Sequence, residues 1–227
     1  MSLSKRLKDW ERGVRNRYNV DPRIPENARR AEIYNNWFDH AILRTFWTNF
    51  FEIAPGVYRS NNPTHERFVE MQKSGIHTVL NLRGKSNSAH YWAEEIACET
   101  LGLNLINCPL NARAAAPREA LLLLIEIFKT IERPFVMHCK SGADRAGFAS
   151  AIYLIVIEGK SVAEARQMLS IKYIHLKFTK TGILDYILRN YQARNDRDEI
   201  SFETWVATEY DHTELQAAFN NKKAIAA

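Results

Sequence analysis

The feature that most constrains the fold is a short apolar run, residues 134–137, that leads directly into a loop of small and polar residues. An apolar run of this length bounded by such a loop predicts a short buried strand. The apolar residues beyond the loop recur at three- and four-residue spacing, which predicts a helix; they are Phe148, Ile152, Ile155 and Val156. The sequence therefore predicts a loop held between a buried strand and a helix.

This loop, residues 138–147, contains residue types that can bind an anion and attack it. Backbone N–H groups of such a loop, and of the helix start behind it, attract negative charge and lower the pKa of a thiol placed there. Cys139 is therefore a candidate thiolate nucleophile. Arg145, six positions later, carries a planar guanidinium that can hold two oxygens of a tetrahedral dianion. Gly142 permits a positive φ and close approach of a ligand.

The arrangement His138-Cys139-(five residues)-Arg145 resembles the signature loop of the cysteine-dependent protein tyrosine phosphatases, which include dual-specificity and phosphoinositide phosphatases. Segments 56–60 (GVYRS) and 75–83 (GIHTVLNLR) are similar to the N-terminal half of bacterial dual-specificity enzymes. The resemblance implies an α/β fold with a mainly parallel central sheet flanked by helices. It also implies a metal-independent phosphomonoesterase that acts on phosphotyrosine or dual-specificity protein substrates through a thiophosphate on the cysteine.

The resemblance also implies which residues bind substrate. His138 is expected to orient the loop from behind, and Lys140 adds a second cation, a feature similar to phosphoinositide-specific members. Arg83 follows a predicted strand, where it helps to shape the pocket, forms a structural ion pair or lies on the surface. The complete set expected to bind substrate is His138, Lys140, Ser141, Gly142, Ala143, Arg83, Asn111 and Arg113.

The sequence departs from the family pattern where the leaving group needs a proton. The family usually supplies an aspartate from a mobile loop upstream, which corresponds here to residues 109–117 and contains no Asp or Glu. Asn111 stands near the expected position and cannot act as an acid. Asp144 is the favoured substitute, because a bound dianion raises the pKa of a carboxyl group that faces it. The alternative is that Asp144 only holds the loop together, and Asp185 is a more distant candidate for the acid.

A second departure is Ala146, where the family usually has a Ser or Thr that bonds the departing thiolate. Its absence predicts slower hydrolysis of the intermediate, by about ten- to a hundredfold, unless the Ser141 hydroxyl takes over. Two alternative functions therefore stay open. One is a phosphoinositide or other phospholipid phosphatase with the same mechanism, and the other is a phosphate-binding pseudophosphatase or adaptor.

Predicted strands and helices alternate through most of the chain, which favours one α/β domain with appendages. We expect an N-terminal helical extension over 1–48, a catalytic domain over 49–194 and a C-terminal helical tail over 195–227. In the extension, the pattern predicts one helix over 26–47 with Trp37 turned inward. In the tail, it predicts a linker over 195–199 and one helix over 202–219.

The overall composition indicates which classes of partner the protein can have. The 227 residues carry a formal net charge of +5, which suits an anionic substrate but is too dispersed to indicate nucleic acid. No spacing of metal ligands stands out, and neither a metal nor a cofactor is expected. Three cysteines and the lack of a secretory leader predict a cytoplasmic protein. The aromatic residues within 46–51 offer a contact with a membrane surface, although such residues more often pack on their own domain.

Overall fold

The computed structural model describes residues 3–39, 41–44 and 46–222. Its centre is a five-stranded sheet in the order β1-β2-β5-β3-β4. β1 pairs antiparallel with β2, and the other neighbouring strands are parallel. The strands are β1 (Phe51–Ala54), β2 (Val57–Ser60), β3 (Thr78–Asn81), β4 (Asn104–Asn107) and β5 (Phe135–His138). The predicted α/β fold with a mainly parallel sheet is confirmed.

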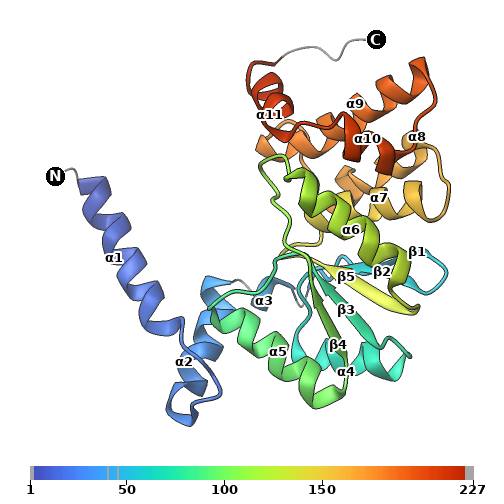
Figure 1. Cartoon of the computed structure of the whole chain (residues 1–227). Helices are drawn as coiled ribbons and strands as arrows, with labels where there is room; N and C mark the ends of the chain where they lie inside the picture. Colours follow the sequence, from blue (N-terminus) through green and yellow to red (C-terminus); the bar gives the residue numbers. More distant parts are fainter. Residues whose placement is uncertain (1–2, 40, 45, 223–227) are drawn as a thin grey trace.

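Helices cover both faces of the sheet because successive residues of a strand point to opposite sides. In β5, Phe135 and Met137 join the larger core, while Val136 joins the smaller one. The larger core includes residues of α6 (Arg118–Thr130), α7 (Arg145–Val156), α9 (Ile183–Arg197) and α10 (Phe202–Thr208). The smaller core includes residues of α4 (His65–Lys73) and α5 (Ala89–Leu101). Figure 1 shows these two groups of helices on either side of the strands.

The pairing register brings the carboxyl ends of three strands to one edge of the sheet. Ser60 at the end of β2 and Asn81 at the end of β3 both lie opposite His138 at the end of β5. The loops that leave these strands therefore meet at a common edge, where parallel sheets generally bind ligands. Because β5 lies between the other two strands, the loop that follows His138 is flanked on both sides.

The N-terminal extension is helical but interrupted, and the single helix predicted over 26–47 was wrong. It consists of α1 (Leu3–Tyr18), a 3-10 turn (Pro25–Asn27), α2 (Ala28–Ile33), a π-helical turn (Tyr34–Phe38) and α3 (Ala41–Arg44). A π turn changes the register of the side chains that follow it. Within this turn Tyr34 is buried, whereas Trp37, which was predicted to point inward, is 65% exposed. α1 projects away from the sheet in Figure 1.

The C-terminal segment also differs from the prediction. α9 continues to Arg197 and takes up part of the predicted linker. The helix predicted over 202–219 is instead two helices, α10 and α11 (His212–Asn220). The Asp211 carboxylate accepts hydrogen bonds from the N–H groups of Thr213 and Glu214, and it thereby caps the start of a new helix. α8 (Val162–Ala165) and short 3-10 turns connect α7 to α9. Residues 1–2 of the predicted extension and 223–227 of the predicted tail lie outside the described residues.

Across the described residues, the structure contains no helix with the length and apolar character needed to cross a bilayer.

Candidate active site

The anion loop, residues 139–145, connects β5 to α7 and carries the predicted nucleophile. Cys139 is 1% exposed and, like the other two cysteines, is a free thiol. Within the described part of the chain, five N–H groups of this loop meet no acceptor: those of Lys140, Ser141, Gly142, Asp144 and Arg145. Unpaired donors gathered at the start of a helix favour binding of a tetrahedral anion.

Gly142 allows the anion loop to pass close beneath its neighbours. The positive φ predicted for this residue is confirmed at +73°. A Cβ atom here would lie 2.7 Å from the Asn61 nitrogen and 2.8 Å from the Ser60 carbonyl carbon, closer than real side chains come. The path of the loop therefore requires glycine at this position.

A buried arginine that was absent from the predicted site holds the anion loop from the interior. Arg59 of β2 is fully buried, and its Nη2 donates to the carbonyl oxygens of Gly142 and Ala143. Its Nη1 donates to the Met168 carbonyl oxygen at 2.8 Å, and its guanidinium lies 3.8 Å from the centroid of the Tyr173 ring. Burial lowers the pKa of Arg59 to about 10, so this side chain remains charged at neutral pH. Two carbonyl groups of the loop thus face a fixed cation.

A cavity of about 540 Å³ opens over the anion loop. Its lining residues are Asp39, Arg44, Trp47, Asn61, Ala112, Arg113, Lys140, Ser141, Asp144, Arg145 and Ile174. The cavity therefore brings together five of the predicted site residues, namely Arg113, Lys140, Ser141, Asp144 and Arg145. The Nε of Arg145 is buried and has no hydrogen-bond partner among the described residues, which leaves it available to a ligand.

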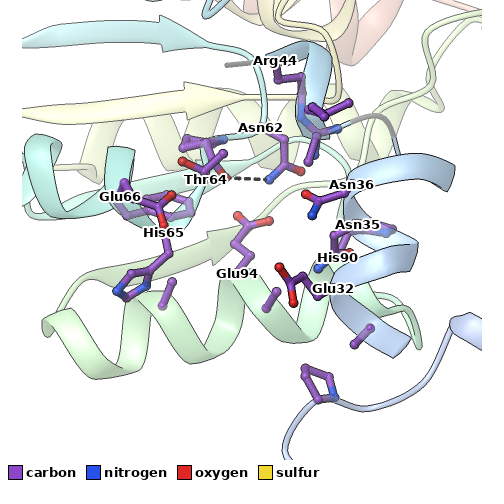
Figure 2. Close-up of a pocket in the computed structure, with 18 of the residues that line it drawn as sticks. Glu32, Asn35, Asn36, Arg44, Asn62, Thr64, His65, Glu66, His90 and Glu94 are labelled. Carbon is purple, nitrogen blue, oxygen red and sulfur yellow. Dashed lines mark hydrogen bonds between the residues drawn. The ribbon is translucent and has the colours of Figure 1, made fainter. Parts of the chain in front are cut away.

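His138 lies behind the anion loop and is fully buried. Its Nε2 lies 2.6 Å from Oε1 of Glu94 on α5, and its Nδ1 lies 3.3 Å from the Cys139 carbonyl oxygen. Glu94 also lines a second cavity of about 500 Å³ between α5 and the N-terminal extension. Figure 2 shows the Glu94 carboxylate in this cavity with Asn36 and Glu32 nearby. Arg44 lines both this cavity and the one over the anion loop.

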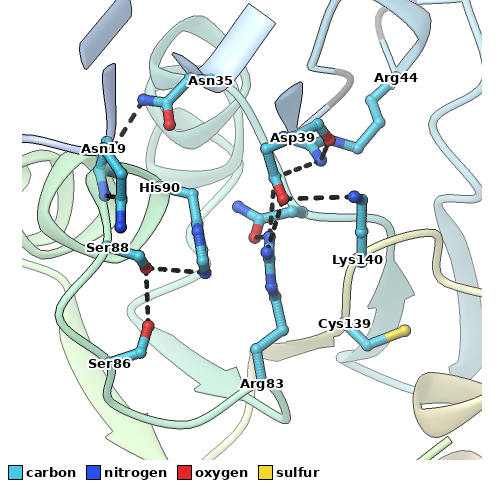
Figure 3. A network of polar contacts seen from close by, with 12 residues as sticks. Asn19, Asn35, Asp39, Arg44, Arg83, Ser86, Ser88, His90, Cys139 and Lys140 are labelled. Carbon is cyan, nitrogen blue, oxygen red and sulfur yellow. Dashed lines mark hydrogen bonds and ion pairs between the residues drawn. The ribbon is translucent and has the colours of Figure 1, made fainter. Parts of the chain in front are cut away.

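Arg83 belongs to an ion-pair network with the N-terminal extension, which Figure 3 shows, and does not line the cavity over the loop. Its terminal nitrogens bind the Asp39 carboxylate at 2.7 and 2.9 Å. Arg44 reaches the same carboxylate at 2.7 Å and Lys140 reaches it at 3.5 Å. Burial favours the neutral carboxyl, but Arg83 and Arg44 outweigh burial and hold the pKa of Asp39 well below its usual range. Of the roles considered for Arg83, the structure shows the ion pair, and Asp39 is ionised.

Two residues that were expected to bind substrate make local contacts with their own loops. Asn111 is exposed, does not line the cavity, and accepts the Arg113 N–H at 2.9 Å. The Ser141 hydroxyl accepts the Ala143 N–H at 3.3 Å. Over the residues that the structure describes, no hydroxyl group donates a hydrogen bond to the sulfur of Cys139.

Asp144 is hydrogen-bonded to a histidine that was not predicted as part of the site. His175 Nδ1 lies 2.8 Å from Asp144 Oδ1, and His175 Nε2 lies 2.6 Å from Asp185 Oδ2. Burial of the imidazole works against its charged form, but hydrogen bonds to Asp144 and Asp185 outweigh burial and raise the pKa of His175 to about 9. At neutral pH the site therefore contains a cationic imidazolium between two carboxylates.

The residues missing from the predicted site, Asp39, Arg59, Glu94 and His175, pair with partners far away in the sequence. A single sequence does not reveal such pairings. Of these four, only Arg59 could have been predicted from the sequence. It shares a strand face with the apolar Val57, two positions earlier, and a charge on a buried face needs a partner.

Among curated proteins, the chain is similar to the dual specificity protein phosphatase TpbA of Pseudomonas aeruginosa. It is 29% identical over 113 residues to the protein of strain PAO1 and 27% identical over 113 residues to that of strain UCBPP-PA14. Each match covers 49% of this chain and 48% of the relative. The chain thus spans about half the length of the curated relatives it matches.

Among solved structures, the crystal structure of P. aeruginosa TpbA matches with a TM-score of 0.53 at 19% identity, covering 77% of this chain and 92% of that one. The crystal structure of Tk-PTP in the active form matches with a TM-score of 0.52 at 21% identity, covering 65% and 99%. At these identities the two structures establish the fold.

The family model that matches is described as a DSP-PTPase phosphatase fused to NAD+ kinase, and the match covers residues 51–182. This range is more than half of the chain and contains all five strands of the sheet, the anion loop and His175. The chain therefore belongs to the DSP-PTPase phosphatase family, as the resemblance around Cys139 and Arg145 predicted.

Proposed function

We propose that the chain is a metal-independent phosphomonoesterase that acts on phosphotyrosine or dual-specificity protein substrates. In the first step the Cys139 sulfur attacks phosphorus, an S–P bond forms, and the bond from phosphorus to the leaving oxygen breaks. In the second step water attacks phosphorus, phosphate leaves, and the thiolate is regenerated. Arg145 and the N–H groups of the anion loop offset the charge that develops on the equatorial oxygens.

The observation that carries this proposal is the grouping of unpaired donors around one thiol. Five loop N–H groups and the buried Nε of Arg145 lack acceptors in the described chain. Folded proteins pair nearly all buried donors, because an unpaired donor costs on the order of 1–3 kcal/mol. A bound phosphoryl group would supply the missing acceptors.

Two carboxyl groups line the cavity, and they have different partners. Asp39 is ion-paired with Arg83 and Arg44, which keep it ionised. Asp144 remains as the proposed donor of the proton that the leaving oxygen needs. Because no hydroxyl takes the place of the family's Ser or Thr at Ala146, we expect the second chemical step to limit turnover.

Protein substrates are supported by the name of the curated relative, a dual specificity protein phosphatase. The cavity supports an aryl phosphate in particular, because Trp47 and Ile174 add apolar lining beside the cations Arg113 and Lys140.

The deciding experiment is turnover of a phosphotyrosine peptide and of an aryl phosphate, with a chelator present and vanadate as the inhibitor. We expect vanadate-sensitive turnover that Cys139→Ser abolishes while phosphopeptide binding is kept. Arg145→Lys should lower kcat/KM by about a hundredfold or more. Cys98→Ser, at a buried thiol on α5, is the matched control and should remain active. Binding without turnover in the unaltered chain would instead identify an adaptor.

A lipid-borne phosphate is the second candidate, and the exposed apolar residues beside the cavity favour it. Trp47 and Ile174 line the cavity and are 43% and 49% exposed, and Phe46 next to Trp47 is 87% exposed. Apolar side chains beside cations are typical of a membrane-surface contact. Phe46→Ala should then lower turnover of a phosphoinositide in vesicles and leave turnover of a soluble aryl phosphate unchanged. If Phe46→Ala changed the turnover of both substrates by the same factor, or of neither, the lipid function would be contradicted.

A further inference from the structure

The proton for the leaving group has no obvious source in this site. The loop that usually supplies an acid, residues 109–117, has no Asp or Glu, and Asp39 is held ionised by arginines. A lone carboxyl group with an ordinary pKa near 4 holds a proton in only about one molecule in a thousand at pH 7. A group that holds a proton at neutral pH beside Asp144 would supply the proton that the leaving oxygen needs.

The structure provides a proton-bearing group in direct contact with Asp144. The His175 side chain is fully enclosed, whereas the Asp144 side chain is 21% exposed and lines the cavity. The two residues meet at 2.8 Å, and Asp185 at the first turn of α9 fixes the other face of the imidazole at 2.6 Å. Asp144 thus lies between the cavity and an enclosed imidazole.

The backbone conformation of Ile174, next to His175, indicates that the surrounding structure holds His175 against Asp144. Ile174 has a φ of +60°, a conformation that β-branched residues rarely adopt. Such strained residues persist where the surrounding structure requires them, and they concentrate at active sites. Here the turn brings Ile174 to the cavity and His175 to Asp144 in two consecutive positions.

We propose that His175 acts through Asp144 as the proton source for the leaving group, with Asp185 as its fixed partner. This inference rests on the proposed phosphatase function and deepens it. His175 is a positioning residue in this scheme, because only Asp144 reaches the substrate.

The proton balance closes over the two steps. In the first step the S–P bond forms and the P–O bond breaks, while the proton of the Asp144–His175 pair passes through the Asp144 carboxyl to the leaving oxygen. His175 is then neutral. In the second step water forms an O–P bond, the S–P bond breaks, and a proton from that water returns through Asp144 to His175.

The charged groups around the imidazole are consistent with this role. Asp144 from the anion loop and Asp185 from α9 act on it directly, and Arg59 from β2 interacts with Asp144. With its pKa raised to about 9, His175 carries its proton in about 99% of molecules at pH 7. A phenolic leaving group has a pKa near 10, so the transfer is closely matched in free energy.

The test compares leaving groups in His175→Gln, which keeps a hydrogen-bond donor but stores no proton. Phenyl phosphate needs a proton at its leaving oxygen, whereas an aryl phosphate with a leaving-group pKa below about 5 does not. We expect at least a tenfold loss of kcat/KM on phenyl phosphate and less than a threefold loss on the activated substrate, because kcat/KM reports the step in which the leaving group departs. An equal loss on both would overturn the proposal. His77→Gln, an exposed histidine at the opposite end of β3, is the matched control.

A second variant keeps the test decisive if His175→Gln folds poorly. Asp185→Asn removes one anion beside the imidazole, so the pKa of His175 should fall. The alkaline limb of kcat/KM for phenyl phosphate, which should lie near pH 9 in the unaltered chain, should then move to lower pH. If the alkaline limb of kcat/KM stayed at the same pH in Asp185→Asn, the proposal would be contradicted. Failure of the phosphatase function itself is distinguishable, because the unaltered chain would turn over neither substrate.

Discussion

At the scale of single residues, the anion loop depends on one position where no side chain fits. Gly142 combines a φ of +73° with neighbours that would lie under 3 Å from a Cβ atom. The chain offers a matched comparison in Gly159, whose φ is +62° and whose Cβ would meet nothing within 4 Å. The first position carries both backbone and steric constraints, and the second carries only the backbone constraint.

Gly142→Ala should therefore weaken vanadate binding by at least about tenfold and lower the free energy of unfolding by more than Gly159→Ala does. The control should cost about 1–2 kcal/mol, the usual penalty of a left-handed conformation, and leave vanadate binding unchanged. Titration with vanadate and denaturant unfolding measure the two effects. Identical behaviour of the two variants would contradict the steric role of the Asn61 and Ser60 backbone.

His175 also predicts how stability depends on pH. Its folded pKa of about 9 lies above the ordinary value of 6.5, so its contribution is complete below pH 6.5 and disappears as pH rises through 9. The loss should be on the order of 3 kcal/mol. Denaturant unfolding at pH 6 and pH 9.5 should show this decline in the unaltered chain and not in His175→Gln. The same decline in both proteins would rule out the raised pKa.

At the scale of elements, the N-terminal extension takes part in the site. The residue that follows its π-helical turn, Asp39, is 1% exposed and binds Arg83 from the loop after β3 and Lys140 from the anion loop. Arg44 of α3 binds the same carboxylate and lines the cavity. One buried anion thus connects the extension to two loops at the edge of the sheet.

Asp39→Asn should lower the free energy of unfolding by about 3 kcal/mol at pH 7, because three cations lose their charged partner. The pKa of Asp39 is depressed, so its contribution exists above the ordinary carboxyl pKa and is lost as pH falls. The difference between variant and unaltered chain should therefore shrink below about pH 4. Asp9→Asn is the control, since Asp9 pairs with Arg12 at 3.9 Å on the surface of α1 and should contribute under 1 kcal/mol. A small effect of Asp39→Asn at pH 7 would contradict the role of this network.

What the sequence could predict follows from the range of the interactions involved. The strand, anion loop and helix around Cys139 are specified within about twenty consecutive residues, so the pattern sufficed for them. Arg59 contacts that loop at Gly142, 83 positions away, and His175 contacts it at Asp144, 31 positions away. Asp39 contacts it at Lys140, 101 positions away. Their partners are set by tertiary packing, which periodicity does not encode. The π-helical turn that contains the exposed Trp37 likewise has no signal in the apolar pattern.

At the scale of the whole molecule, the C-terminal segment belongs to the larger core. Phe202, Trp205 and Tyr210 are buried there. Tyr210 donates its hydroxyl hydrogen to the Ala116 carbonyl oxygen at 2.7 Å, and Gln216 accepts the Ala115 N–H at 2.8 Å. The loop before α6 is thereby held by the last helices of the chain. The limits 1–48, 49–194 and 195–227 remain predictions as domain boundaries.

Tyr210→Phe should lower the free energy of unfolding by about 1–2 kcal/mol, because it leaves the buried Ala116 carbonyl without its donor. Tyr186→Phe is the control, since within the described residues the Tyr186 hydroxyl makes no hydrogen bond. Denaturant unfolding compares the two variants, and equal stability would contradict the hydrogen bond. A chain ending at residue 199 should show no cooperative unfolding, because it loses the buried aromatic groups of α10.

The position of the Arg59 guanidinium implies that a mutation outside the substrate site can inactivate the protein. The guanidinium sits on the inner side of the anion loop and draws two peptide carbonyls toward itself, which orients those dipoles before any ligand arrives. A neutral residue at position 59 would leave the sulfur and Arg145 chemically intact while removing the charge that aligns the peptides around them. Inactivation can thus originate at a side chain that no substrate or inhibitor ever touches.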